Sequence, residues 1–177
     1  METNAVRIDD NFLSNDELLS LQHLMIVSNR FSWYYNNFVD YAPDEDVKVE
    51  DYLHNFQFTH LFYKNNSPAS NYLEILDPIL RKLNIVSLVR VKANLSTVSG
   101  NIEHHNFHID VPDKNCTTAI FYLNSNNGLT VFEDGTVIKS VANRLIRFSS
   151  GLNHTGTTCT DSKIRCLINF NYFEKNE

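Results

Sequence analysis

The stretch IRCLINFNYF, residues 164–173, gives the clearest strand signal in the chain. Successive side chains of a β-strand point to opposite faces, so every second residue shares a face. One face is apolar and consists of Cys166, Ile168, Phe170 and Tyr172. The opposite face begins with Arg165, Leu167 and Asn169. The run therefore predicts a largely apolar strand that carries one arginine.

Seven more strand-like segments lie at short intervals before this run. They are residues 88–95, 103–109, 117–123, 129–132, 136–138, 144–148 and 154–158. Turn signals separate some of them, notably Asn126-Asn127-Gly128 and Asp134-Gly135. Eight short strands without intervening helices predict a mainly β fold of the sandwich or jelly-roll type.

The N-terminal half contains two helix signals. Ser14 and Glu17 have the spacing of a capping box ahead of a helical apolar pattern over residues 18–25. Ser67-Pro68 is expected to open a second helix, because proline suits a first helical turn. Pro78 is expected to kink or split that helix.

Aromatic residues are frequent between the two helix signals, and residues 31–41 and 56–63 are predicted as strands. We expect residues 1–177 to form a single domain. Within it, residues 86–173 would form the β core, and residues 1–85 would support it with helices that pack on one face.

Composition narrows the classes of partner and compartment. The net charge of −6 disfavours nucleic acid, whose phosphates favour proteins with a surplus of Lys and Arg. Cys116, Cys159 and Cys166 are odd in number and form no CxxC motif, which favours a reduced intracellular protein. Residues 1–4 show no signal-peptide pattern, and no apolar run approaches the roughly 20 residues of a membrane span. We expect a cytoplasmic protein without a membrane partner.

His108 and Asp110 are two residues apart in a predicted strand, so their side chains should share a face. His154, much later in the chain, is the candidate third ligand of the same metal ion. Two histidines and one carboxylate on one side of a metal form a facial triad, which leaves adjacent coordination positions open. A closed structural site with four ligands lacks such positions. The three residues therefore predict a catalytic metal site.

Arg165 needs an anionic partner, because a buried and unpaired charge is very costly. The surrounding run contains no Asp or Glu. A dicarboxylate ligand would supply the partner, since the planar fork of arginine fits a carboxylate.

Residues 86–173 resemble the 2-oxoglutarate- and Fe(II)-dependent oxygenases, in particular their prolyl 4-hydroxylase-like branch. The resemblance rests on several stretches in the right order. They are RVKANL (90–95), HID (108–110), TTAIFYLN (117–124), GLTVF (128–132), His154, and Arg165 with its strand.

The resemblance implies a double-stranded β-helix, the cupin-like form of the jelly roll, with the metal at one end. His108, Asp110 and His154 would hold Fe(II) as the catalytic centre. The co-substrate 2-oxoglutarate would chelate the iron, and Arg165 would pair with its distal carboxylate. O2 would be the second co-substrate, and ascorbate would support the reaction.

The resemblance also implies further co-substrate contacts. Tyr122 matches a tyrosine whose hydroxyl often reaches the distal carboxylate in the hydroxylase branch, and Thr118 lies on the same strand face. Asn169 stands where relatives often have a small hydroxyl residue, which is a departure from the family pattern. Asn94 is placed near the co-substrate by an alignment that allows a slip of one residue.

The implied reaction is substrate hydroxylation with release of succinate and CO2, and a peptidyl proline is the first candidate substrate. The presence of Asp110 favours hydroxylation over halogenation. Alternatives are a free amino acid or other small metabolite as substrate, nucleobase demethylation, which the acidic balance disfavours, and a non-catalytic metal-binding β-barrel that serves as an interaction module. Compact relatives are common in phage genomes, so a viral origin and a location in the host cytoplasm are further expectations. The sequence does not decide the substrate, the oligomeric state or whether residues 31–63 cover the substrate.

Overall fold

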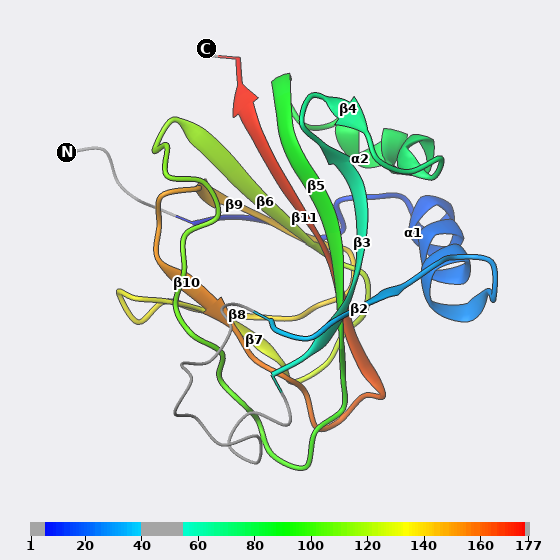
Figure 1. Ribbon diagram of the computed structural model, residues 1–177, viewed down its shortest axis with the longest axis vertical. Coiled ribbons are helices and arrows are strands. Elements are labelled where there is room, and N and C mark those ends of the chain that lie inside the picture. Colours follow the sequence, from blue (N-terminus) through cyan, green and yellow to red (C-terminus); the bar gives the residue numbers. More distant parts are fainter. Residues whose placement is uncertain (1–5, 40–54, 176–177) are drawn as a thin grey trace.

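A computed structural model describes residues 6–39 and 55–175, so the last two residues of the predicted strand 31–41 lie outside the described residues. Its strands form two antiparallel sheets (Figure 1). The large sheet has the order β1-β9-β6-β11-β5-β3-β2, with β4 paired to β3. The small sheet has the order β10-β7-β8. Two facing antiparallel sheets confirm the predicted mainly β, jelly-roll architecture.

The strand bounds follow most of the predicted segments. The large sheet consists of β1 (Arg7–Asp9), β2 (Tyr34–Asn36), β3 (Gln57–Lys64), β4 (Ser67–Pro68), β5 (Ile85–Thr97), β6 (Cys116–Tyr122), β9 (Arg144–Ser149) and β11 (Ile164–Glu174). The small sheet consists of β7 (Leu129–Phe132), β8 (Val137–Lys139) and β10 (His154–Gly156).

Strand β11 is central in the large sheet, between β5 and β6. Its apolar face packs in the main core, which the helices cover, and the members from β11 are Cys166, Ile168, Phe170 and Tyr172. Leu167, on the opposite face, belongs to a second apolar cluster with Tyr122 and Phe132. The alternation predicted for this strand is therefore confirmed, and it separates a helix-covered face from a face that looks toward the small sheet.

The helices lie on one side of the large sheet and the small sheet lies on the other (Figure 1). Helix α1 (Asn15–Gln22) begins with the predicted capping box between Ser14 and Glu17, and a π-helical turn, η1 (His23–Val27), continues it. Leu21 and Met25 bury their side chains in the main core. None of the helices in residues 6–39 and 55–175 is long and apolar enough to cross a membrane.

The prediction that Ser67-Pro68 opens a helix is wrong. These residues form β4, which pairs with β3 across a tight turn in which Asn65 and Asn66 have φ of 54° and 58°. Two successive positive φ angles match a two-residue hairpin turn, and asparagine accepts this conformation at low cost. The helical signal begins later, with a 3-10 turn, η3 (Leu73–Leu76), followed by α2 (Asp77–Leu80). Pro78 lies in the first turn of α2 and so separates the two.

The predicted strand 103–109 does not form as a continuous strand. The segment instead makes isolated bridges to the region of β10, from His104 to Thr157 and from His108 to His154. Between the two bridges, the N–H of His105 donates to the Gly156 carbonyl at 3.2 Å. This irregular backbone still runs beside β10 and extends that edge of the small sheet.

Asn143 joins the N-terminal segment to the sheet, and it supplies a test of the fold. Its side chain is 4% exposed, and its amide makes two bonds of 2.8 Å to the backbone N–H and C=O of Leu13. Its φ of 64° suits asparagine better than alanine. We expect Asn143→Ala to lower the free energy of unfolding by about 2–4 kcal/mol in urea titrations, because two backbone groups lose their partner.

Asn66→Ala is the matched control, because Asn66 also has a positive φ but is exposed. It should cost only the conformational penalty, about 1 kcal/mol. Equal losses in the two variants would show that the buried amide of Asn143 contributes nothing beyond its backbone conformation.

Candidate metal centre and arginine pocket

His108, Asp110 and His154 converge, and their candidate ligand atoms all lie within 4.8 Å of one another. The backbone brings them together: the N–H of His108 donates to the C=O of His154 at 2.9 Å, and the reverse bond is 3.0 Å. The two imidazole rings lie 4.7 Å apart between centroids. A reciprocal bridge of two hydrogen bonds therefore places the first histidine opposite the third ligand, and Asp110 follows two residues later.

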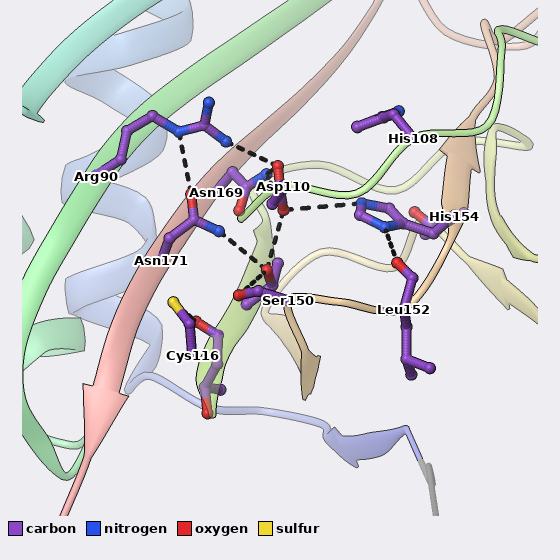
Figure 2. Close-up of polar contacts among 12 residues, drawn as sticks. Arg90, His108, Asp110, Cys116, Ser150, Leu152, His154, Asn169 and Asn171 are labelled. Atoms are coloured by element: carbon purple, nitrogen blue, oxygen red, sulfur yellow. Dashed lines mark hydrogen bonds and ion pairs between the residues drawn. The ribbon is translucent and has the colours of Figure 1, made fainter. Parts of the chain in front are cut away.

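His154 is held in the tautomer that a metal needs (Figure 2). Its Nδ1 lies 3.0 Å from the carbonyl oxygen of Leu152, which can only accept, so Nδ1 carries the proton. Nε2 then has a free lone pair and faces Asp110 Oδ2 at 3.8 Å. Burial lowers the pKa of His154, which favours the neutral imidazole that coordinates metals.

The Asp110 carboxylate, 3% exposed, is surrounded by donors (Figure 2). Arg90 Nη2 donates to Oδ1 at 2.7 Å, and Thr118 Oγ1 donates to Oδ2 at 3.0 Å. Asn169 Nδ2 lies 3.3 Å from Oδ1 and 3.1 Å from Oδ2. Burial raises the pKa of Asp110, but the charge of Arg90 and the hydrogen bond from Asn169 oppose it, and the pKa lies below its ordinary value. The group is therefore ionised, as a metal ligand must be.

A second set of side chains fixes those donors. Arg90 Nε donates to Asn171 Oδ1 at 3.0 Å, and Asn171 Nδ2 donates to Thr118 Oγ1 at 2.9 Å. Thr118 also bonds Ser150 Oγ at 2.9 Å. Sequence reasoning assigned no role to Arg90 or Asn171. The signal was present for Arg90: a cation in an alternating strand without a nearby acid, which was the argument applied to Arg165.

Arg165 is buried and has only neutral hydrogen-bond partners among the described residues. Nε donates to Ser140 Oγ at 2.9 Å, and Nη2 donates at 3.1 Å both to the Leu129 carbonyl and to Thr130 Oγ1. No carboxylate in residues 6–39 or 55–175 forms an ion pair with it. Burial lowers the pKa of Arg165. Within the described part of the chain, the structure thus leaves this cation without an anionic partner.

Two glycines make room for Arg165. A Cβ atom on Gly128 would lie 2.5 Å from Arg165 Cδ and 2.9 Å from Nε, so the side chain lies directly on bare backbone. A Cβ on Gly156 would lie 3.4 Å from Nη1. Gly156 is two residues after His154 on β10, so the guanidinium lies roughly 7 Å along this strand from the metal ligand.

The other predicted contact residues lie between these two points. Leu167, between Arg165 and Asn169 on β11, is in register with Tyr122 on one side and Asn94 on the other. The Tyr122 hydroxyl lies 2.7 Å from Thr130 Oγ1, and its ring lies 5.8 Å from Arg165 Cζ.

Two amide oxygens on this face lack a hydrogen-bond partner among the described residues. They are Asn94 Oδ1 and Asn169 Oδ1, and both are buried. Thr118 and Asn169 contact the Asp110 carboxylate, and neither bonds Arg165. The sequence placed Asn169 near the distal carboxylate, and in the structure its amide nitrogen is used at the metal end.

The residues present fit a divalent metal and a short diacid. The donor set has two imidazole nitrogens and a carboxylate, with one neutral histidine and one ionised aspartate, which suits Fe(II) and similar ions. The arginine pocket begins about two strand residues away and requires an anion. Two buried amide oxygens on this face have no hydrogen-bond partner among the described residues, and such groups are usually satisfied by a ligand or water.

No family model matches the sequence, and no curated protein matches it. Solved structures do match. A prolyl hydroxylase from Trichoplax adhaerens, in complex with a hypoxia inducible factor peptide, is 18% identical with a TM-score of 0.60, covering 97% of this chain and 84% of that one. A viral collagen prolyl hydroxylase from Paramecium Bursaria Chlorella virus-1 is 17% identical with a TM-score of 0.55 and coverages of 96% and 90%.

A 2OG-Fe(II) oxygenase family protein from Burkholderia pseudomallei is 12% identical, with a TM-score of 0.65 and coverages of 99% and 87%. The fold is that of these oxygenases. Agreement over nearly the whole chain at such low identity shows that the two-sheet architecture, with its N-terminal helices, is common to this protein and to these oxygenases.

Removal of Asp110 tests the metal centre. We expect Asp110→Ala to weaken Co(II) binding by on the order of 100-fold or more, because the variant loses one ligand and gains an unpaired Arg90 beside the site. Titration calorimetry measures the affinity, and circular dichroism checks the fold. Glu133→Ala, which removes an exposed carboxylate, should bind Co(II) like the parent. Equal affinity in all three proteins would remove Asp110 from the site.

Proposed function

We propose that this protein is a 2-oxoglutarate- and Fe(II)-dependent oxygenase that hydroxylates its substrate and releases succinate and CO2. The observation that carries the proposal is a pair of features. A His-Asp-His set is held together by backbone pairing, and a buried arginine without an anionic partner among the described residues packs against Gly156, two residues after His154. Neither feature alone calls for a keto-diacid. Together they match one, because the metal would bind its keto-acid end and the arginine its distal carboxylate.

His108, Asp110 and His154 would hold Fe(II) at adjacent positions and leave the remaining ones to ligands. When bound, Fe(II) supplies the oxidative chemistry with 2-oxoglutarate and O2. The protein keeps Asp110 charged and oriented, because Arg90 binds Oδ1 while Oδ2, which accepts from Thr118, faces His154. Leu152 fixes the ring of His154 through Nδ1, so that Nε2 cannot rotate away from the site.

Arg165 would bind the distal carboxylate of 2-oxoglutarate. Its Nε and Nη2 are used by neutral acceptors, which fix the plane of the guanidinium before a ligand arrives. Tyr122 would add its hydroxyl to the same carboxylate by giving up its bond to Thr130. Asn94 flanks Leu167 from the other side, where its amide would border the middle of the co-substrate.

We propose a peptidyl proline as the substrate. Two of the compared structures are prolyl hydroxylases, and one of them holds a peptide, which supports this choice over a small metabolite. The intact set of three ligands supports catalysis over a purely structural barrel, because a structural site gains nothing from open metal positions.

Co-substrate binding is tested without turnover. We expect Fe(II) and 2-oxoglutarate, mixed without O2, to give the visible charge-transfer band of a chelated keto acid. Gly128→Ala should weaken 2-oxoglutarate binding on the order of tenfold or more, because the new methyl group would displace Arg165 from its seat. Gly100→Ala is the matched control, since its Cβ would meet nothing within 4 Å. A wild-type protein that folds but gives no band would refute the proposal.

Substrate class is tested by mass spectrometry. We expect proline-containing peptides to gain one oxygen atom when Fe(II), 2-oxoglutarate and O2 are present, with succinate formed in step. Asp110→Ala should form neither product, because the metal is lost. Oxygen addition to free amino acids but to no peptide would replace the peptidyl substrate with a small molecule and leave the oxygenase proposal intact.

A further inference from the structure

Lys92 is a cation next to the metal centre that the proposed reaction does not use. It lies on β5 between Val91 and Ala93, whose side chains are buried in the main core, so its own side chain points to the opposite face. Arg90, two residues earlier on that face, contacts Asp110. In the neighbouring strand β11, the residue in register with Lys92 is Asn169, which also contacts Asp110. Lys92 therefore lies beside the carboxylate that would bind the metal.

No hydrogen bond or ion pair is formed by the Lys92 ammonium with any residue in 6–39 or 55–175, although the side chain is partly buried. Arg90, by contrast, is bonded to both Asp110 and Asn171. A partly buried lysine without a partner loses hydration and gains nothing in return. The arrangement is thus unfavourable unless an anion from outside the described residues completes it.

The charges of the loaded site would not supply that anion. A metal dication and the 2-oxoglutarate dianion balance each other, and Asp110 balances Arg90. Arg165 and Lys92 remain as surplus positive charges, and only Arg165 lies where the distal carboxylate would bind. A carboxylate of the substrate would supply negative charge that neither the described residues nor the co-substrate brings to Lys92.

A pocket lies one strand away from Lys92, which is not itself among the residues that line it. Leu61 on β3 is in register with Lys92, and it also lines a pocket of about 660 Å³. The other walls come from β2, represented by Tyr34, and from residues 68–72. The pocket therefore starts one strand away from the lysine, at the edge of the large sheet.

We infer that Lys92 binds a carboxylate of the substrate, and that the protein prefers substrates with an acidic side chain near the hydroxylated residue. This inference rests on the proposed oxygenase function and adds the substrate class to it. The acidic group would form a charge-assisted hydrogen bond with the ammonium, while the rest of the peptide occupies the pocket beside Leu61. Lys92 is then a specificity-determining residue.

The charge of Lys92 gives the inference a pH dependence. Burial lowers the pKa of Lys92 to about 8; the charges of Arg90 and Lys64 add to this effect, and Asp110 opposes it. The ammonium is therefore protonated at neutral pH and loses its proton as the pH rises through 8. Carboxylate binding should weaken over the same range.

The test uses full-length protein labelled with 13C-lysine and loaded with Zn(II) and 2-oxoglutarate, so that no turnover occurs. The resonance of Lys92 is the one missing from Lys92→Met. We expect acetate to shift it, and acetamide, the neutral analogue, to leave it in place. The capped dipeptide acetyl-Glu-Pro-amide should bind on the order of tenfold more tightly than acetyl-Gln-Pro-amide, and the difference should vanish in Lys92→Met.

Lys64→Met is the matched control, because it removes an exposed cation from the neighbouring strand and should keep the preference for the acidic dipeptide. Free L-glutamate in place of the dipeptide distinguishes an amino-acid carboxylate from one within a peptide, and a shift with either supports the site. An unmoved Lys92 resonance would overturn the inference, as would a shift by inorganic phosphate alone. Competition between acetate and 2-oxoglutarate for Lys92 would also overturn it, because the lysine would then serve the co-substrate.

The inference and the proposed function fail separately. Loss of the Fe(II)–2-oxoglutarate band in the wild-type protein would refute the oxygenase, whatever acetate does to Lys92. An intact band in both wild type and Lys92→Met, combined with equal affinity for the two dipeptides, would refute only the role of Lys92.

Discussion

The reciprocal backbone pair between His108 and His154 is the constraint on which the site depends. Two hydrogen bonds fix one imidazole against the other, and the chain direction then carries Asp110 into the space beside them. The segment around His108 has no continuous ladder with β10, so these bonds are local and few. A regular strand would fix only which face each side chain of this segment points to. The irregular backbone around His108 also sets the distance to His154, the ligand from the other strand.

The pairing of buried charges is the second constraint on the structure of the site. The interior face of β5 and β11 carries Arg90, Lys92 and Arg165, but Asp110 is the one acid bonded there among the described residues. A folded protein tolerates such an excess only where the cations have partners or reach ligands. Arg90 is satisfied by Asp110, whereas the other two are not satisfied by any described acid. The distribution of partners thus separates the cation that orders the metal ligand from the cations that await anions.

The sequence predicted the fold class well, because the strands of the core are long enough to show their period. The alternation in residues 164–173 was confirmed on both faces, and the capping box of α1 formed as expected. Pro68 misled, since proline is compatible both with a helix start and with an edge strand. The two asparagines before it, Asn65 and Asn66, adopt positive φ angles and form the hairpin turn that makes Pro68 part of a strand.

At the site, the sequence brought together the three ligand candidates but not the residues that support them. Arg90 and Asn171 act through contacts between β5 and β11, and register between distant strands is not visible in one sequence. The contact of Arg165 with Gly128 was equally hidden, because the glycine was read as part of a turn and of the stretch GLTVF, and neither reading places it against Arg165. The local sequence pattern predicts on which face of a strand a side chain lies. The pairing of distant strands determines which residues that side chain contacts.

The bare backbone under Arg165 has a consequence for chemical selectivity. With Gly128 below and Gly156 beside it, the guanidinium has little freedom to advance or retreat along the strand. The distance between the guanidinium and the metal ligands is therefore fixed, and it limits the length of any dicarboxylic acid that could bind to both. If a keto-diacid binds as proposed, one that is a carbon shorter would leave its far end short of the guanidinium and one that is a carbon longer would have to bend, so the fixed separation would favour a single chain length.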